Sequence, residues 1–409
     1  MRIRHALLAT AVATVLTACG SAVSGTPIPG ETDIRALDTG SYPTEPLNAH
    51  DDDPIVPFYE MYEVAALRLA DYVISPGEIS AELIYGTSAG TAWRSVVPSW
   101  LGQGAGDIAV SHKLLYGFEA SGASIDKSIN SSGWPSKDPA SKFTANTVVL
   151  QFPDSQRAAA AARELYDADF GRQEGRTEPV ALPAHPDAHA HWRPDSPFLR
   201  TFMAHGSYVI GFLLSLPAPD RPALTTLAES AYTKQIEALS KTTPLTEEEV
   251  MTLPWDADHL LMRALNPDQS TRPDSVGTGY LRTGKHGALN YADGRLLPSD
   301  RRYVDKQLTA MNAEQIAISA GTLVIRTSDP ESAHRALTEK LFPWPVEAGA
   351  DPAPQVPDAM CVENRRADSV KRFSCLLAYK EYVGIVSSNQ LLDAHQRAAA
   401  QYAIFANTR

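Results

Sequence analysis

The segment Gly86–Gly90, with Ser88 at its centre, matches the G-x-S-x-G pattern of serine hydrolases. In those enzymes the pattern bends a strand sharply into a helix and exposes the serine hydroxyl as a nucleophile. The mechanism would also need a histidine base, for which His286, His334 and His395 are available downstream. No glycine-rich oxyanion element precedes the motif, and small residues also suit a flexible turn. We therefore expect a turn and no enzymatic activity, and keep an exported serine hydrolase as the alternative.

A second group of reactive side chains is formed by His185, His189 and His191, with Asp187 between them. Alternate residues of a strand point to the same side, so His189 and His191 could share a metal ion. A zinc ion needs three or four such ligands. Three prolines surround the group, however, and prolines disfavour a regular strand. We expect a solvated loop and no cofactor, and keep the three histidines as candidate metal ligands.

The elements that would position such residues occur twice along the chain. Thr147–Asp154 leads into one alanine-rich run, and Thr322–Asp329 leads into another, with the same offset at both ends of the segment. Each pattern predicts a buried strand, an aspartate that caps a helix, and then the helix itself. A second matched pair, Ala204–Val209 and Ala378–Val383, follows at an offset that is shorter by one position, and predicts a β-hairpin before a further helix.

The repeated order predicts an α+β fold made of two tandem related units, each an antiparallel sheet with helices packed on one face. Chance similarity between two common patterns is the alternative, and packing of the units as a pseudo-dimer stays open. Thr246 and Glu249 predict a capping box just after the junction. The expected parts are a signal peptide (1–18), a lipidated cysteine with a flexible tether (19–57), and two domains (58–243 and 244–409).

The N-terminus carries an export signal. A basic start with Arg2 and Arg4 precedes a short apolar run that is too short to span a bilayer. Leu16–Cys19 resembles the bacterial lipobox, in which the cysteine receives a diacylglycerol and becomes the first residue of the mature protein. We expect lipidation of Cys19; a plain secreted protein is the alternative.

Cysteine usage agrees with export. The chain has three cysteines, and lipidation of Cys19 leaves an even pair, Cys361 and Cys375, which lie close together in the sequence. In an extracytoplasmic protein such a pair is expected to form a disulfide. A metal site is the alternative, but the pair lacks C-x-x-C spacing.

Several segments resemble a family of actinobacterial lipoproteins that carry domains of unknown function and occur in mycobacteria, nocardiae and their relatives. Gly25–Arg35 and Leu37–Thr44 are similar to the start of that family, and Arg68–Val73 and Val149–Asp154 are similar to later parts. The resemblance implies a cell-envelope lipoprotein and identifies no catalytic residue. The strand–Asp–helix–hairpin pattern is also loosely similar to extracytoplasmic sensor domains of mycobacterial receptor kinases, which is a likeness of fold alone.

Charge excludes one class of partner. Lys and Arg number 36 against 48 Asp and Glu, which gives a net charge of −12 without a basic cluster. Nucleic-acid binding needs clustered basic residues, so we expect no nucleic-acid partner. The sequence predicts a non-catalytic binding or sensor-like module at the extracytoplasmic face of the cell membrane, anchored through Cys19. An envelope lipid, a glycan or a protein is the expected ligand.

Overall fold

The computed structural model describes residues 32–47, 58–125, 143–172, 175–267, 281–284, 301–319, 321–346, 348–364 and 371–408. The predicted signal peptide, Cys19 and His286 lie outside these residues. Among the described residues, no helix combines the length and the apolar character that crossing a membrane requires.

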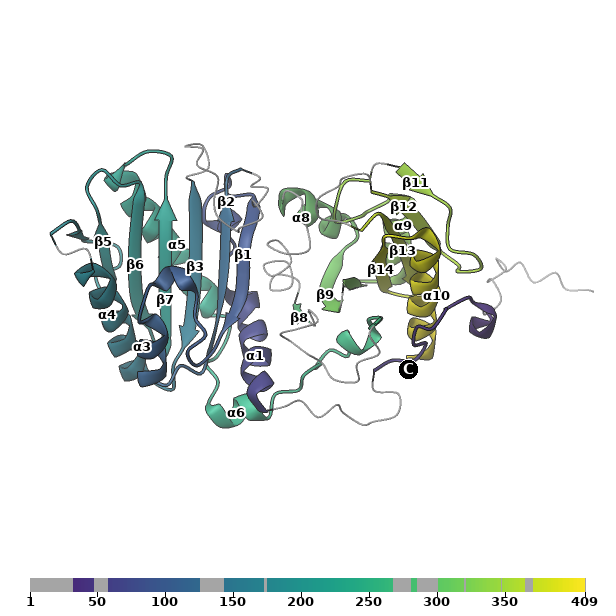
Figure 1. Cartoon of the computed structure of the whole chain (residues 1–409), viewed down its shortest axis with the longest axis horizontal. Helices are drawn as coiled ribbons and strands as arrows, with labels where there is room; N and C mark the ends of the chain where they lie inside the picture. Colours follow the sequence, from purple (N-terminus) through teal and green to yellow (C-terminus); the bar gives the residue numbers. More distant parts are fainter. Residues whose placement is uncertain are drawn as a thin grey trace, which may run out of the picture. The chain divides into compact units, whose positions relative to one another are not determined.

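The N-terminal half contains an antiparallel sheet in the order β1-β2-β3-β7-β6-β5-β4 (Figure 1). Its strands are β1 (Tyr85–Ala92), β2 (Tyr116–Ala123), β3 (Thr144–Gln151), β4 (Glu178–Val180), β5 (His189–Trp192), β6 (Phe198–His205) and β7 (Tyr208–Ser215). Its helices are α1 (Phe58–Leu69), α2 (Pro76–Ile79), α3 (Ala105–Ser111), α4 (Ser155–Gly171), α5 (Arg221–Leu239) and α6 (Glu247–Met251).

The C-terminal half contains a second antiparallel sheet, in the order β8-β9-β10-β14-β13-β12-β11. Its strands are β8 (Leu281–Gly284), β9 (Ala313–Ser319), β10 (Thr322–Thr327), β11 (Ala348–Ala350), β12 (Ala359–Glu363), β13 (Phe373–Tyr379) and β14 (Tyr382–Ser388). Its helices are α8 (Arg301–Ala310), α9 (Pro330–Thr338) and α10 (Leu391–Asn407). Strand for strand, this is the order of the first sheet, so the predicted α+β fold with two related units is confirmed.

The register of the strands matches the repeat residue by residue. Val149 of β3 lies opposite Ile210 of β7, and Val324 of β10 lies opposite Gly384 of β14. Val149 and Val324 are separated by the offset of the repeated strand–helix segments, and Ile210 and Gly384 are separated by the offset of the repeated hairpins. The two halves therefore share one topology and one register around their central strands.

Both repeated helices begin at the predicted aspartate caps. Asp154 Oδ1 accepts the backbone N–H of Arg157 at 2.8 Å, and Asp329 Oδ1 accepts that of Ser332 at 2.7 Å. The alanines shared by the two runs are fully buried, at positions 158, 161, 333 and 336. Small side chains at these positions let the helix pack closely on the sheet.

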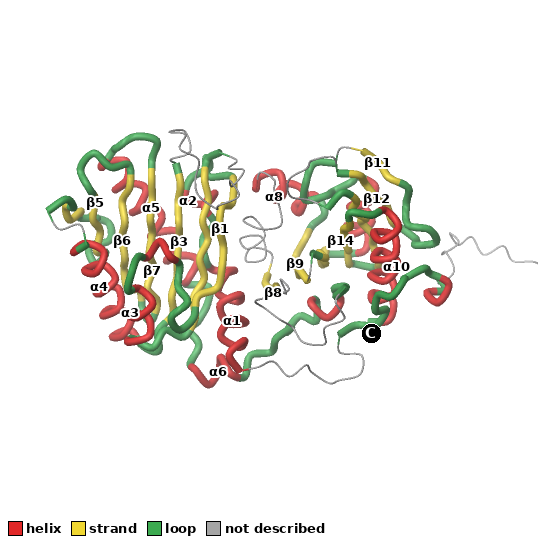
Figure 2. The backbone as a smooth tube through the Cα atoms, viewed as in Figure 1, coloured by secondary structure: helices red, strands yellow, loops and turns green. Residues whose placement is uncertain are grey.

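Helices cover both faces of each sheet, which corrects the prediction of one covered face (Figure 2). In the C-terminal sheet, buried residues of α9 share a core cluster with Leu323 and Ile325 of β10, whereas those of α10 share another with Val324. On β6, Arg200 reaches Asp169 of α4, whereas the next residue, Thr201, hydrogen-bonds to Tyr232 of α5 at 2.9 Å. Neighbouring residues of a strand point to opposite faces, so α4 and α5 lie on opposite sides of the sheet. The sequence signal for the second covered face is the nearly continuous apolar run of β7. A strand covered on only one face would alternate between apolar and polar residues.

Part of the predicted tether is folded. Leu37 is buried in the core cluster that contains α10 residues, and the Tyr42 hydroxyl donates to Asp393 Oδ1 at 2.5 Å. Asn407 Nδ2 donates to the carbonyl oxygen of Thr44 at 2.7 Å. The prediction from composition was wrong for residues 34–47, because a few spaced apolar residues suffice to pack a loop-rich segment on a helix.

The boundary between the domains also differs from the prediction at residues 243 and 244. Gln151 Nε2 donates to the carbonyl oxygen of Leu245 at 2.6 Å, and Leu245 N–H donates back to Gln151 Oε1 at 3.1 Å. Thr246 and Glu249 form the predicted capping box of α6, and α6 packs against α1. Residues 245–251 therefore belong with the N-terminal sheet.

Candidate functional site

A largely buried ion cluster lies where α4, β5 and β6 meet. Asp169 Oδ2 lies 2.8 Å from His191 Nε2, and Asp169 Oδ1 lies 2.6 Å from Arg200 Nη1. His191 and Arg200 are direct partners across the β5–β6 pair. Arg172, three residues after Asp169, places Nη2 3.8 Å from the same Oδ1. One carboxylate therefore faces two guanidinium groups and an imidazole.

The length of α4 brings the carboxylate to this cluster. Ala158, Ala161 and Leu165 form the buried stripe of α4, and Asp169 follows Leu165 at helical spacing. The helix has 17 residues, whereas its counterpart α9 has 9 and ends at Thr338. The additional turns of α4 carry Asp169 to the β5–β6 pair.

The cluster keeps its carboxylate ionised. Burial raises the pKa of Asp169, but the hydrogen bond from His191 and the positive charge of Arg200 outweigh burial, so the pKa lies below its usual value. Burial lowers the pKa of Arg200, while Asp169 opposes that effect. A guanidinium group stays protonated at any physiological pH, so the pair is ionic.

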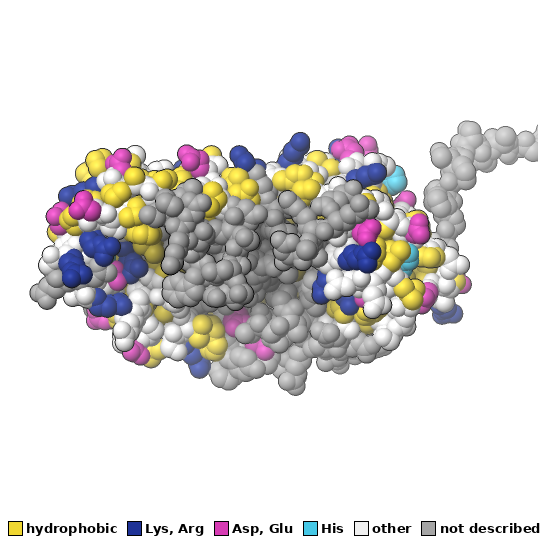
Figure 3. All heavy atoms as spheres, turned by 45° about the horizontal axis from the view of Figure 1, so that its top comes forward, with side chains coloured by type: hydrophobic (Ala, Val, Ile, Leu, Met, Phe, Trp, Pro, Cys, Tyr) yellow, Lys and Arg dark blue, Asp and Glu magenta, His cyan; other side chains and the backbone are white. Residues whose placement is uncertain are grey.

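A cavity of about 290 Å³ opens beside the cluster. Its walls are formed by Asp169, Thr177, His191, Arg193, Ser196, Phe198, Arg200 and Leu213. A shallower hollow of about 430 Å³ adjoins it and shares Thr177 and Arg193. Figure 3 shows basic side chains gathered on the surface of the N-terminal half, in a chain whose net charge is −12.

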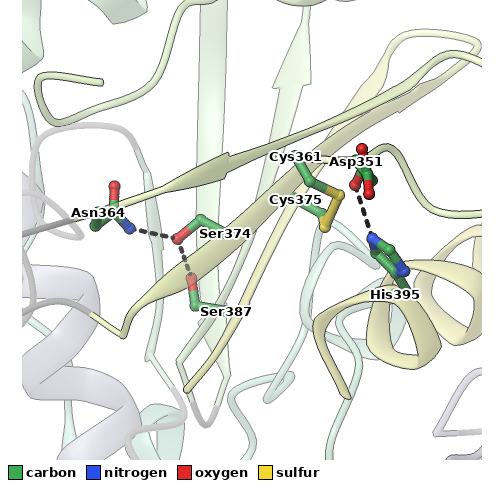
Figure 4. The surroundings of a disulfide bond; sticks show 7 residues. All are labelled: Asp351, Cys361, Asn364, Ser374, Cys375, Ser387 and His395. Carbon is green, nitrogen blue, oxygen red and sulfur yellow. Dashed lines mark hydrogen bonds between the residues drawn. A yellow bond between two sulfur atoms is a disulfide. The ribbon is translucent and has the colours of Figure 1, made fainter. Parts of the chain in front are cut away.

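The same sheet positions in the C-terminal half carry no charge. The hairpin offset relates Arg200 to Ser374 and Leu213 to Ser387, which are partners in the β13–β14 pair. Asn364 Nδ2 donates to Ser374 Oγ at 3.0 Å, and Ser374 Oγ lies 2.9 Å from Ser387 Oγ (Figure 4). This row of cross-strand partners is therefore neutral and hydrogen-bonded in the C-terminal half and charged in the N-terminal half.

Comparison with known proteins places both halves in one family. The family model described as Domain of unknown function (DUF7373) N-terminal matches residues 57–255, and the DUF7373 C-terminal model matches residues 260–408. The chain belongs to the DUF7373 family. The predicted tandem domains of unknown function are therefore confirmed, and the gap between the two DUF7373 matches lies after α6.

Comparisons with other proteins add little to this family assignment. No curated protein matches this DUF7373 chain. The crystal structure of the extracellular domain of PknH from Mycobacterium tuberculosis is similar over 45% of this chain and 98% of that chain. Its sequence identity is 10% and its TM-score 0.27.

The three predicted histidines do not converge on one point. His189 and His191 lie on β5, where both rings pack beside Tyr166 of α4. His185 turns to α5, with Nε2 3.0 Å from the carbonyl oxygen of Glu229. The prediction of a loop was wrong for His189 and His191, because cross-strand pairing with β4 and β6 orders them.

Ser88 lies inside a strand, which corrects the prediction of a turn. The motif falls within β1 at the edge of the sheet, with a register shift between Gly86 and Ser88. The Ser88 hydroxyl donates to Glu119 Oε1 at 3.2 Å, and Glu119 Oε2 also accepts the indole N–H of Trp100. A nucleophile elbow requires a strand-to-helix turn, so the motif has no hydrolase context here.

Cys361 and Cys375 form a disulfide between directly opposed residues of β12 and β13. The imidazole of His395 lies beside them, and its Nε2 lies 2.7 Å from the carbonyl oxygen of Asp351 (Figure 4). Within the described ranges this is the one group of three potential metal ligands, and both thiols are consumed by the disulfide.

The sequence predictions included His191 but missed Asp169, Arg193 and Arg200. A signal exists for Asp169, because a carboxylate continues the buried stripe of a helix at regular spacing. No local signal pairs it with Arg200, since that contact depends on how α4 packs on β6.

Proposed function

We propose that this DUF7373 protein is a lipid-anchored extracytoplasmic module that binds a ligand in the pocket beside Asp169, His191 and Arg200. The lipobox at Leu16–Cys19 supports the anchor, and export follows from the same segment. The family match is compatible with this role, because it assigns no activity.

One observation carries the binding role: two domains of the same topology differ in charge at one row of the sheet. The row His191–Arg200 is charged in the N-terminal domain, and the related row through Ser374 is neutral. Burying charges costs free energy that a neutral hydrogen-bonded row avoids. Since the fold does not require the charges, a ligand is the natural reason for them.

The proposed role is non-catalytic. Ser196 shares the pocket with His191 and Asp169, which could suggest a catalytic triad. Its hydroxyl accepts the N–H of Phe198 at 3.4 Å, and in the described part of the chain it forms no hydrogen bond with His191. In this proposal neither Ser196 nor Ser88 acts as a nucleophile.

Two labelling experiments test the proposal. Palmitate labelling in a host that processes lipoproteins should mark the wild type and a Cys361→Ser/Cys375→Ser variant but not Cys19→Ser. Retention of label in Cys19→Ser would contradict the anchor. A fluorophosphonate probe should leave the protein unlabelled; labelling that disappears in Ser88→Ala or Ser196→Ala would establish a serine hydrolase instead.

A further inference from the structure

We infer that the pocket of the N-terminal domain binds a phosphomonoester, with its dianionic phosphate between Arg193 and Arg200 and its organic part against Phe198. The inference rests on the proposed binding function and names the ligand class. Its support comes from charge, from the exposed aromatic ring and from the size of the cavity.

The first argument is the excess of positive charge. Arg193 and Arg200 line the cavity, and Arg172 reaches Asp169 from the end of α4. Among the described residues that line the cavity, Asp169 is the one carboxylate, and it lies close to the guanidinium groups of Arg172 and Arg200. The adjoining hollow is lined by one further cation, Arg176, and by one further carboxylate, Glu178, which forms an ion pair with Arg221. The surplus of positive charge matches a phosphate dianion better than a carboxylate or sulfate monoanion, and guanidinium forks suit phosphate oxygens.

The second argument is an exposed aromatic ring on the same face as the cation. Phe198 and Arg200 are two residues apart on β6, so their side chains leave the sheet on one side. Phe198 is 44% exposed although it is large and apolar. Leu213, the partner of Arg200 across the β6–β7 pair, adds apolar surface to the cavity. A ligand with an apolar group next to its phosphate would cover this ring.

The size of the cavity sets the portion of ligand that it can hold. Ligand pockets usually span about 300–1,000 Å³, and this cavity of about 290 Å³ is at the small end. It can enclose a phosphate and one ring or a short chain, while a larger molecule would extend into the hollow beside Arg193. A free phosphomonoester and the headgroup of a phosphatidate lipid both satisfy this chemistry.

Calorimetric titration of the purified full-length protein with four probes tests the ligand class. Phenyl phosphate should bind one to one, and inorganic phosphate more weakly, because it cannot contact Phe198. Benzoate and phenyl sulfate, which are monoanions, should bind about tenfold more weakly than phenyl phosphate or worse. Equal binding of the monoanions would overturn the inference.

Three variants locate the contacts. Arg193→Gln should weaken both phosphates about tenfold or more, since a charge-assisted hydrogen bond is lost. Phe198→Ala should weaken phenyl phosphate and leave inorganic phosphate unchanged. Lys241→Gln removes the same charge at an exposed position near the end of α5 and should change neither. Unchanged binding in Arg193→Gln would place the ligand elsewhere and overturn the inference.

Vesicles distinguish the two sources of the phosphate. Recruitment to phosphatidylcholine vesicles that contain phosphatidate, lost in Arg193→Gln, would identify a lipid headgroup. Binding of phenyl phosphate without such recruitment would identify a free phosphomonoester. If neither phenyl phosphate nor phosphatidate vesicles bind, a phosphomonoester ligand is excluded. The proposed function would still hold if the pocket retained a different ligand or if Cys19 carried palmitate.

Discussion

Arg200 and Ser374 occupy the same position in two sheets of the same strand order, yet one is an ion-paired cation and the other a hydrogen-bonded hydroxyl. The difference extends to their neighbours, because His191 corresponds to Val362 and Leu213 to Ser387. Duplication of a fold allows one copy to specialise while the other keeps the scaffold. The charged copy is therefore where we place ligand binding.

Arg200→Ser reproduces the C-terminal arrangement at one position and is expected to destabilise the N-terminal domain by about 2 kcal/mol. The reason is that the largely buried Asp169 carboxylate loses its closest ion-pair partner. Denaturant unfolding measures the loss. The double variant Asp169→Asn/Arg200→Ser should be more stable than Arg200→Ser alone, and the reverse order would contradict the ion-pair explanation.

Acid should weaken the cluster through Asp169. Because the folded-state pKa of this carboxyl is lower than its unfolded value, its contribution is fully present above the unfolded pKa. The contribution is lost as the pH falls through the folded pKa, since the unfolded chain binds the proton first. Urea midpoints measured from neutral pH down to pH values below both pKa values should therefore fall less steeply in Asp169→Asn than in the wild type. Parallel curves would assign the acid sensitivity to other carboxyl groups.

The two helix caps provide a matched pair of substitutions. Asp154→Ala should cost about 1 kcal/mol, the usual value for a lost cap. Asp329→Ala should cost more, because Asp329 also accepts hydrogen bonds from the hydroxyls of Ser328 and Ser332. Urea unfolding of both variants gives the comparison. A larger loss for Asp154→Ala would contradict this ranking.

Removal of the disulfide should destabilise the C-terminal domain. Cys361→Ala/Cys375→Ala is expected to lower the free energy of unfolding by about 3 kcal/mol, the value for a closed loop of about 15 residues in the chain-entropy model. Reduction of the wild type should produce a similar loss, and reduction of the double variant should produce none. A stable reduced wild type would show that β12–β13 pairing suffices without the bond.

Local patterns predicted much of the fold, and long-range packing accounts for most of what they missed. The repeated strand–Asp–helix unit was recognisable because periodicity and capping are encoded within a few residues, as at Asp154 and Asp329. The second covered face was not predicted, although the continuous apolar run of β7 signals it. The site was only partly predicted: His191 was noticed as a possible metal ligand, but its partner Arg200 is identified only by the β5–β6 register.

Native mass spectrometry of the protein purified from the host envelope tests the central claim, that the charged N-terminal pocket holds a ligand. The wild type and Lys241→Gln should carry the same extra mass, released on unfolding, and Arg193→Gln should not. The claim would be contradicted if the wild type showed only the mass of the polypeptide and its lipid anchor. It would also be contradicted if Arg193→Gln retained the extra mass in full.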